Sequence, residues 1–218
     1  MSCSGVDFEL QSVCISPGRC VIKCSVRVEV IQELEPGDPS LEIPWASPDN
    51  ARVRFIDLKK FPKKLEHVKE CRKHAPLALL LRRVNAAGSA LRTAKCDVWI
   101  TTKLAEDEQV DFDVRYKIGS YVDLVFDSNR LNSHLESHLR FGKQLEDVLT
   151  PCRIQAQMEI AVRRCLFHPK ERWGYYFTIF VHAYGATRTN ARREWDRAVD
   201  SLADALSIIG PSFRQKSP

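Results

Sequence analysis

No stretch of this sequence is apolar enough to cross a membrane. The longest apolar run, Ala75 to Leu81, falls far short of the roughly 20 residues that a membrane-spanning helix needs. The first residues also lack the basic and apolar regions of a signal peptide. We therefore expect an intracellular protein that is not secreted. We also expect its eight cysteines to be reduced thiols rather than a disulfide framework.

The motifs of nucleotide binding and of common catalysis are missing as well. All nine glycines stand singly, so neither GxGxxG nor GxxxxGK occurs, and the chain has no GxSxG or HExxH. We therefore predict no catalytic residue, no cofactor and no small-molecule substrate. An enzyme that uses a cysteine or a histidine remains an alternative, because both residue types are available without any local signature.

The sequence offers two groups of possible metal ligands. Cys20 and Cys24 lie on one face of a predicted strand, where a separation of about 13 Å is too long for one zinc ion. His134 and His138 lie one turn apart on a predicted helix, and such pairs are usually exposed without a metal. We predict buried thiols that act as small apolar side chains, and no metal site.

Basic charge is concentrated in one part of the chain. Residues Arg52 to Lys95 contain 13 lysines and arginines against 3 aspartates and glutamates, although the whole chain has a net charge of only +5. The rest of the chain therefore has a balance of −5. This asymmetry predicts an acidic partner, such as nucleic acid, an anionic membrane or an acidic protein. The alternative is an ordinary solvated face.

Within this basic segment, the predicted binding surface is Lys59 to Lys73. Pro62 suits the first turn of a helix, and Leu65 and Val68 give that helix an apolar side, which leaves its lysines exposed. Such a surface binds phosphates or lipid headgroups in a salt-dependent way, and Lys59 to Lys64 also resembles a nuclear-import signal. The predicted nucleic-acid-binding or lipid-binding residues are Lys59, Lys60, Lys63, Lys64, Lys69, Arg72 and Lys73.

The periodicity of the chain predicts an α+β fold, with a mainly antiparallel sheet and about four helices packed on it. We expect one globular domain over residues 1–218, with flexible ends at 1–7 and 212–218. A proline-rich connector at 35–52 holds Trp45 as an anchor on the core, and Gly119 is expected to break a strand. The predicted strands are 8–15, 19–31, 95–104, 110–117, 121–126, 154–167 and 173–184, and the predicted helices are 62–71, 77–85, 129–149 and 190–209.

The last predicted strand is rich in aromatic residues. Tyr175, Tyr176, Phe177, Phe180 and Tyr184 suggest a base-stacking sheet of the kind found in RNA-recognition modules. The signature motif of those modules is missing, and aromatic side chains of this size commonly fill protein cores. We therefore predict that these five side chains pack in the core.

The chain resembles the matrix proteins of rhabdoviruses, possibly those that infect plants. The resemblance is architectural and involves no specific motif: it rests on chain size, net basic charge, an opening strand at Arg19–Ile31, paired helices under a basic surface, and a closing hairpin at Arg153–Tyr184. The chain departs from the animal-virus members by lacking a Lys-rich N-terminal arm. The resemblance implies a virion protein without catalytic residues that condenses the nucleocapsid, binds the inner leaflet of the membrane and self-associates. Lys59 to Lys73 would then contact nucleocapsid or lipid.

The favoured hypothesis is therefore a non-enzymatic structural and assembly protein, similar to a viral matrix protein. It would bind nucleocapsid, RNA or an anionic membrane surface through its basic segment and would form homo-oligomers. If viral, it would be found in the virion and in the host cytoplasm or nucleus. The main alternative is an RNA-binding regulatory protein such as a silencing suppressor, which should respond to RNA length or strandedness and should not bind liposomes.

Overall fold

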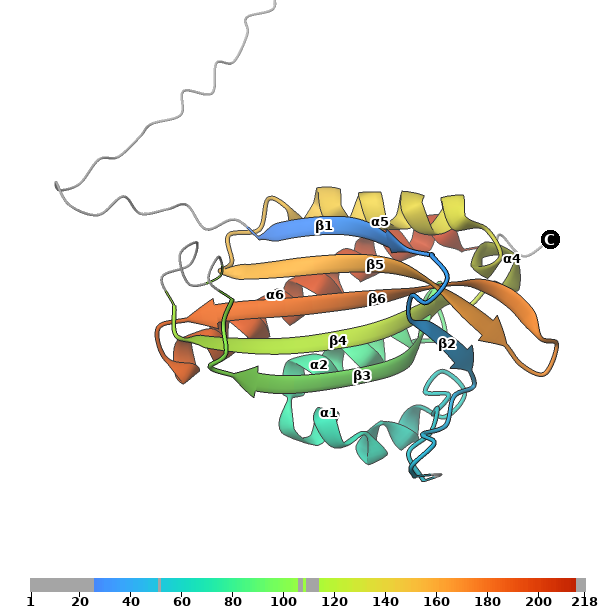
Figure 1. Ribbon diagram of the computed structural model, residues 1–218, viewed down its shortest axis with the longest axis horizontal. Coiled ribbons are helices and arrows are strands. Elements are labelled where there is room, and N and C mark those ends of the chain that lie inside the picture. Colours follow the sequence, from blue (N-terminus) through green and yellow to red (C-terminus); the bar gives the residue numbers. More distant parts are fainter. Residues whose placement is uncertain (1–25, 51, 106–107, 109–113, 215–218) are drawn as a thin grey trace, which may run out of the picture.

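One mixed β-sheet organises the chain (Figure 1). The computed structural model describes residues 26–50, 52–105, 108 and 114–214. Along the sheet the strand order is β1-β5-β6-β4-β3, and β2 pairs with the far end of β5. The strands are β1 (Arg27–Glu33), β2 (Ser40–Ile43), β3 (Leu91–Thr101), β4 (Tyr116–Phe126), β5 (Ala156–Phe167) and β6 (Arg172–Gly185).

The centre of the sheet is antiparallel and one side of it is parallel. β3, β4, β6 and β5 pair antiparallel in that order, whereas β1 and β2 both run parallel to β5. The predicted α+β class is therefore confirmed, with a sheet that is mixed rather than purely antiparallel. The end of the strand predicted over 19–31 is present as β1. Val28 and Val30 of β1, and Val26 just before it, contact the core. The rest of that prediction, together with 8–15, lies outside the described residues.

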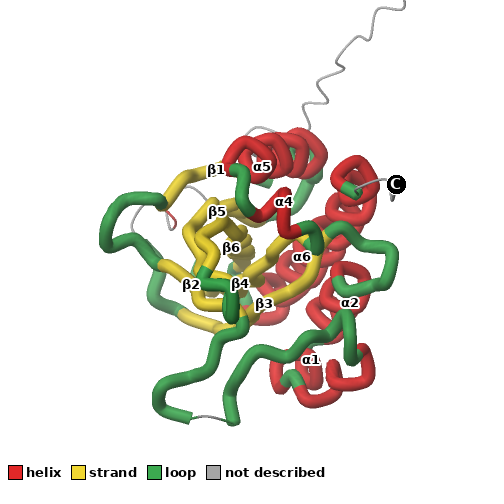
Figure 2. Tube along the Cα trace, turned by 90° about the vertical axis from the view of Figure 1, so that its right-hand side faces the viewer, coloured by secondary structure: helices red, strands yellow, loops and turns green. Residues whose placement is uncertain are grey.

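The long helices all pack on one face of the sheet. α6 and α2 lie behind the strands in Figure 1 and to their right in Figure 2, and α5 runs along the β1 edge at the top of both views. α6 packs on β6, with α5 and α2 on either side of it. The helices are η1 (Pro62–His67), α1 (Lys69–Lys73), α2 (Ala75–Val84), α4 (Asn129–Asn132), α5 (Leu135–Leu149), α6 (Arg188–Ile209) and η2 (Gly210–Phe213), where η denotes a 3-10 helix.

The main core fills the space between this helical layer and the sheet. Strand residues such as Ile160 and Phe177 are fully buried against helix residues such as Leu145 and Leu202. The indole of Trp195 on α6 is also fully buried, and its Nε1 donates a hydrogen bond to the Ser120 hydroxyl at 2.9 Å. This bond avoids the free-energy penalty of burying an unpaired N–H group. The apolar stripe predicted for the last helix is confirmed, because Val199, Leu202, Leu206 and Ile209 are all buried.

β4 runs through Gly119 without interruption, so the predicted strand break at this residue is wrong. The neighbouring strand explains why glycine is needed here. A Cβ atom on Gly119 would lie 2.4 Å from the indole of Trp99, which therefore rests directly on the β4 backbone. Glycine in this strand marks a close side-chain approach and does not terminate the pairing.

Two expected boundaries also need correction. The helix predicted over 129–149 is divided into α4 and α5, because Ser133 ends the first helix and His134 begins the second with extended backbone angles. The C-terminal end expected to be flexible from residue 212 is instead ordered through η2, where Phe213 is buried against Phe126 and Phe141. Residues 1–7 and 215–218 lie outside the described residues.

Candidate binding site: a basic groove at the edge of the sheet

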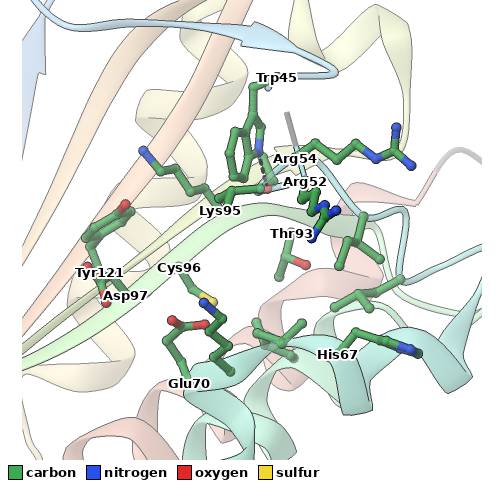
Figure 3. A pocket seen from close by; sticks show the side chains of 17 residues that line it. Trp45, Arg52, Arg54, His67, Glu70, Thr93, Lys95, Cys96, Asp97 and Tyr121 are labelled. Carbon is green, nitrogen blue, oxygen red and sulfur yellow. Dashed lines mark hydrogen bonds between the residues drawn. The ribbon is translucent and has the colours of Figure 1, made fainter. Parts of the chain in front are cut away.

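A groove with a cavity of about 340 Å³ runs along the free edge of β3 (Figure 3). The connector after β2 forms one wall, the segment of η1 and α1 forms the other, and β3 forms the floor. We call this cavity the edge groove and define it by six of its lining side chains, which are Trp45, Arg52, Arg54, Lys69, Lys95 and Tyr121.

Trp45 fixes the connector over β3. Its indole Nε1 donates a hydrogen bond to the Ala94 carbonyl at 2.7 Å, and its own carbonyl accepts one from the backbone N–H of Phe55 at 2.9 Å. An isolated bridge between Ala46 and Arg54 then turns the connector back on itself. Trp45 therefore attaches the connector to β3 through a hydrogen bond, but its half-buried ring is not part of the buried core, where the sequence predicts it. A consequence of this attachment is that Arg52 and Arg54 line a wall of the groove.

The edge groove carries an excess of positive charge. Its lining includes four cations, Arg52, Arg54, Lys69 and Lys95, all of them exposed, and two acidic side chains, Glu70 and Asp97. None of the four cations forms an ion pair with an acidic side chain within the described part of the chain. Their charges are therefore available to an anionic ligand.

Lys95 lies at the junction of the groove with the sheet face opposite the helices. Its ammonium group is 5.4 Å from the ring centroid of Trp45 and 5.9 Å from that of Tyr121. Figure 3 shows its side chain extending between these two rings. Cation–π attraction favours this position, so the cation marks where the groove opens toward the rings of the sheet.

Four half-buried rings lie on the sheet face that no described helix covers. Trp99, Tyr121, Phe180 and His182 come from β3, β4 and β6, and neighbouring ring centroids are 6.0 to 6.4 Å apart. We call these four residues the aromatic strip. Tyr121 is opposite Phe180 in the sheet, and Gly119 separates the other two rings. Because Tyr121 also lines the edge groove, the two features are continuous.

The far end of the same sheet face is closed. There β2 and the connector pack on the sheet, so that Ile43, Val125, Cys165 and Tyr176 form a second buried cluster with Phe55 at its margin. Within the described residues, the aromatic strip and the edge groove lie beyond this cluster. Glu108 lies near His182 of the strip, and its carboxylate accepts hydrogen bonds from the Tyr184 hydroxyl and from Lys117.

The seven predicted cations do not form one site. Lys59 is half-buried: its ammonium donates to the carbonyls of Ser89 and Leu91 at 2.6 and 3.3 Å and pairs with Asp127 at 2.8 Å. Lys69 alone among the seven lines the edge groove. The remaining five are exposed on η1 and α1 or just before them, and they are Lys60, Lys63, Lys64, Arg72 and Lys73.

Two of these exposed lysines flank a ring. Lys60 and Lys64 have ammonium groups 5.4 and 4.5 Å from the ring centroid of Phe61, which is itself exposed. The seven-residue prediction did not include Arg52, Arg54 and Lys95, which are close to one another only because the connector folds over β3. The sequence contains one indication that these residues belong to the site: all three lie in the basic segment, and Arg52 and Lys95 are its two ends.

Three of the described thiols are poorly suited to nucleophilic chemistry. Burial raises the pKa of Cys71 to about 12, and it also raises the pKa of Cys96 and Cys165 above the usual range. A thiolate is the reactive form, so these groups remain protonated at neutral pH. The predicted burial is confirmed for Cys71 and Cys165, while Cys20 and Cys24 lie outside the described residues.

The two histidines that were considered as a metal pair have separate environments. His134 is exposed, whereas His138 is fully buried, and its Nδ1 donates to the His134 carbonyl at 3.0 Å. Burial lowers the pKa of His138 to about 4, so the ring is neutral at pH 7. Among the residues that the structure describes, no group of three or more His, Cys, Asp or Glu side chains is placed to hold a metal ion.

The aromatic residues of β6 divide between the two faces of the sheet. Core packing is confirmed for Phe177, which is buried in the main core, and Tyr175 packs against that core. Tyr176 is buried in the second cluster and Tyr184 is fully buried outside both clusters, and both lie on the same face as Phe180. Phe180 departs from the prediction because it is half-buried on the uncovered face. Side chains alternate along a strand, so the sequence predicts that Phe177 and Phe180 lie on opposite faces of the sheet. It does not predict which of the two faces the helices cover, because that depends on the whole fold.

No described helix is both long and apolar enough to cross a membrane. No protein-family model, curated protein or solved structure matches the chain. Inference about function therefore depends on the edge groove and the aromatic strip.

Proposed function

We propose that this protein is a non-enzymatic RNA-binding protein whose edge groove holds the phosphates of the RNA. The observation that supports this most directly is the convergence of Arg52, Arg54, Lys69 and Lys95 on one groove bordered by aromatic rings. Guanidinium groups match phosphate oxygens in a bidentate way, and lysines add mobile point charges. Sites for nucleic-acid strands commonly combine such a basic groove with rings.

Other properties of the site support binding over catalysis. The thiols with raised pKa values disfavour a cysteine nucleophile. The four cations of the groove also outnumber its two carboxylates, Glu70 and Asp97, which favours the binding of an anionic ligand. An assembly protein that condenses a nucleocapsid would use the same contact to RNA. Its self-association and its contact with anionic membrane stay predictions from the sequence.

The test compares two charge reversals of equal size. One variant carries Arg52→Glu and Arg54→Glu in the groove, and the control carries Lys60→Glu and Lys63→Glu on the exposed surface beside it. Affinity for a labelled single-stranded RNA is measured by fluorescence anisotropy over a range of salt concentrations. We expect the groove variant to bind at least about tenfold more weakly, and the slope of log affinity against log salt to fall by about 0.7 for each lost phosphate contact.

Two results would contradict the proposal. An equal loss of RNA affinity in both variants would show that binding depends on general positive charge. That outcome agrees with the binding surface predicted from the sequence, Lys59 to Lys73. Binding to phosphatidylserine vesicles with loss in the groove variant, and no binding to RNA, would assign the groove to lipid headgroups.

A further inference from the structure

We propose that the RNA is held as an unpaired strand whose bases stack on the aromatic strip of Trp99, Tyr121, Phe180 and His182. This inference rests on the proposed function, because the edge groove would hold the phosphates of the same strand. Stacking on a sheet face is tolerant of sequence, since every base has a flat π-surface. The strip would therefore select for unpaired bases rather than for a particular sequence.

The rings are built into the surface of the sheet. Trp99 and His182 are the partners of Gly119 on its two sides, and the missing side chain at Gly119 lets the indole lie across β4. The Trp99 and His182 ring centroids are consequently only 6.0 Å apart. Tyr121 and Phe180 form the adjacent row, also at 6.0 Å. The sheet backbone thus fixes the positions of four neighbouring rings, whose planes are inclined to one another by 27° to 69°. Such fixed rings reduce the entropy lost when a base binds.

The charges around the aromatic strip favour phosphates in the edge groove and bases on the strip. Lys95 is within 5.9 Å of the Tyr121 ring centroid and also lines the edge groove, so it connects the two features. At the two ends of the Tyr121 and Phe180 row are the acidic residues Asp97 and Glu159, which are their partners in the neighbouring strands. Carboxylates repel phosphates, so the strip favours the bases and the groove favours the backbone.

The protonation state of the rings fits neutral stacking. Burial lowers the pKa of His182 to about 4, with a further contribution from the nearby Lys117, so the imidazole is uncharged at pH 7. Burial also raises the pKa of the Tyr121 hydroxyl, so this ring stays a phenol. Paired bases of a duplex are stacked within the helix and cannot reach these rings, which is why we infer an unpaired strand.

The experiment compares three labelled ligands with the same number of phosphates: a single-stranded RNA, the same sugar-phosphate strand without bases, and a short RNA duplex. We expect the wild-type protein to bind the intact single strand about tenfold more tightly than the abasic strand, with the duplex close to the abasic strand. Equal affinity for intact and abasic strands would overturn this inference and leave the proposed function standing. No binding to any of the three at low salt would overturn both.

A variant set then assigns the effect to the strip. Trp99→Leu with Phe180→Leu leaves every defining side chain of the edge groove in place. This double variant should reduce the preference for the intact strand to less than about threefold while binding to the abasic strand is kept. Trp173→Leu is the control, because this aromatic residue of β6 is 60% exposed and lies outside the strip. A preference that survives in the double variant would overturn the assignment. If the double variant does not fold, the comparison of intact and abasic strands on the wild-type protein still decides the proposal.

Discussion

Asp123 is the most strongly desolvated carboxylate on the uncovered sheet face. It is 5% exposed and accepts a hydrogen bond from the Thr178 hydroxyl at 2.7 Å, and Arg163 donates to that same hydroxyl at 3.1 Å. Burial raises the pKa of Asp123 from 3.8 to about 6 despite this hydrogen bond and the nearby Lys95 and Arg163. The folded state therefore holds a proton at a pH at which the unfolded chain has released it.

This shift predicts that Asp123 lowers stability as the pH rises. Between about pH 4 and 6 the folded state binds more protons at this group than the unfolded state, so its contribution to the free energy of unfolding falls across that window. Replacing Asp123 with Asn should leave stability unchanged below pH 4 and raise it above pH 6 by roughly 3 kcal/mol relative to wild type. Urea unfolding at several pH values measures the difference in free energy of unfolding between the variant and wild type. A difference that does not change with pH would show that protonation of Asp123 is not its cause.

Gly119 leaves the space that the Trp99 indole occupies, so the free-energy cost of filling this space can be measured. The variant Gly119→Ala places a methyl group 2.4 Å from the indole, so Trp99 must move, and we expect a loss of about 1–3 kcal/mol in the free energy of unfolding. The same substitution in a Trp99→Leu background should cost much less, because the obstructing ring is absent. Equal costs in the two backgrounds would show that the indole does not rest on β4.

At the scale of elements, Lys59 joins the connector to the beginning of β3. Its side chain is 12% exposed and bridges two backbone carbonyls and Asp127, which is also an ion-pair partner of Arg92. Lys59→Met keeps the length of the side chain and removes its charge, leaving the two carbonyls without this donor. We expect a loss of about 2 kcal/mol, against less than about 0.5 kcal/mol for the exposed control Lys60→Met. Thermal unfolding of the two variants measures this, and equal losses would contradict the assigned role.

Elements defined by local pattern were predictable, and elements defined by distant partners were not. The β5–β6 hairpin and α6 lie within about two residues of their predicted positions, because alternation, apolar stripes and turn residues signal them locally. The parallel pairing of β1 with β5 has no local signal, since it joins residues about 130 positions apart.

The candidate site shows the same limit more strongly. Charge density correctly directed attention to the basic segment, and its ends, Arg52 and Lys95, both line the edge groove. The groove itself depends on the hydrogen bond from Trp45 to the Ala94 carbonyl, which spans 49 residues. The sequence also does not show that Lys59 binds backbone carbonyls and Asp127 within the protein. A lysine in a basic run has the same sequence pattern whether its side chain is buried or exposed.

For the whole molecule, one continuous core links the sheet to its helical layer. This main cluster contains residues from β1, β3, β4, β5 and β6 and from the helices α1, α2, α5 and α6. We therefore expect the described fold to unfold in a single cooperative transition. Tryptophan fluorescence, to which the buried Trp195 contributes together with the three other tryptophans, should give the same urea midpoint as far-UV circular dichroism. Two separate midpoints would show that part of the sheet is stabilised independently of α6.

The parallel pairing of β1 has a consequence for the order in which the chain is made. Arg27 of β1 lies opposite Gln157 of β5, so a ribosome must add about 130 residues after β1 before its partner exists. At roughly 5–20 residues per second, the nascent chain carries an unpaired strand for roughly 6–26 seconds. Throughout that interval Val28 and Val30 have no sheet to join. A ribosome-bound chaperone would therefore have to shield β1 for longer than β5, whose partner β6 follows it directly in the chain.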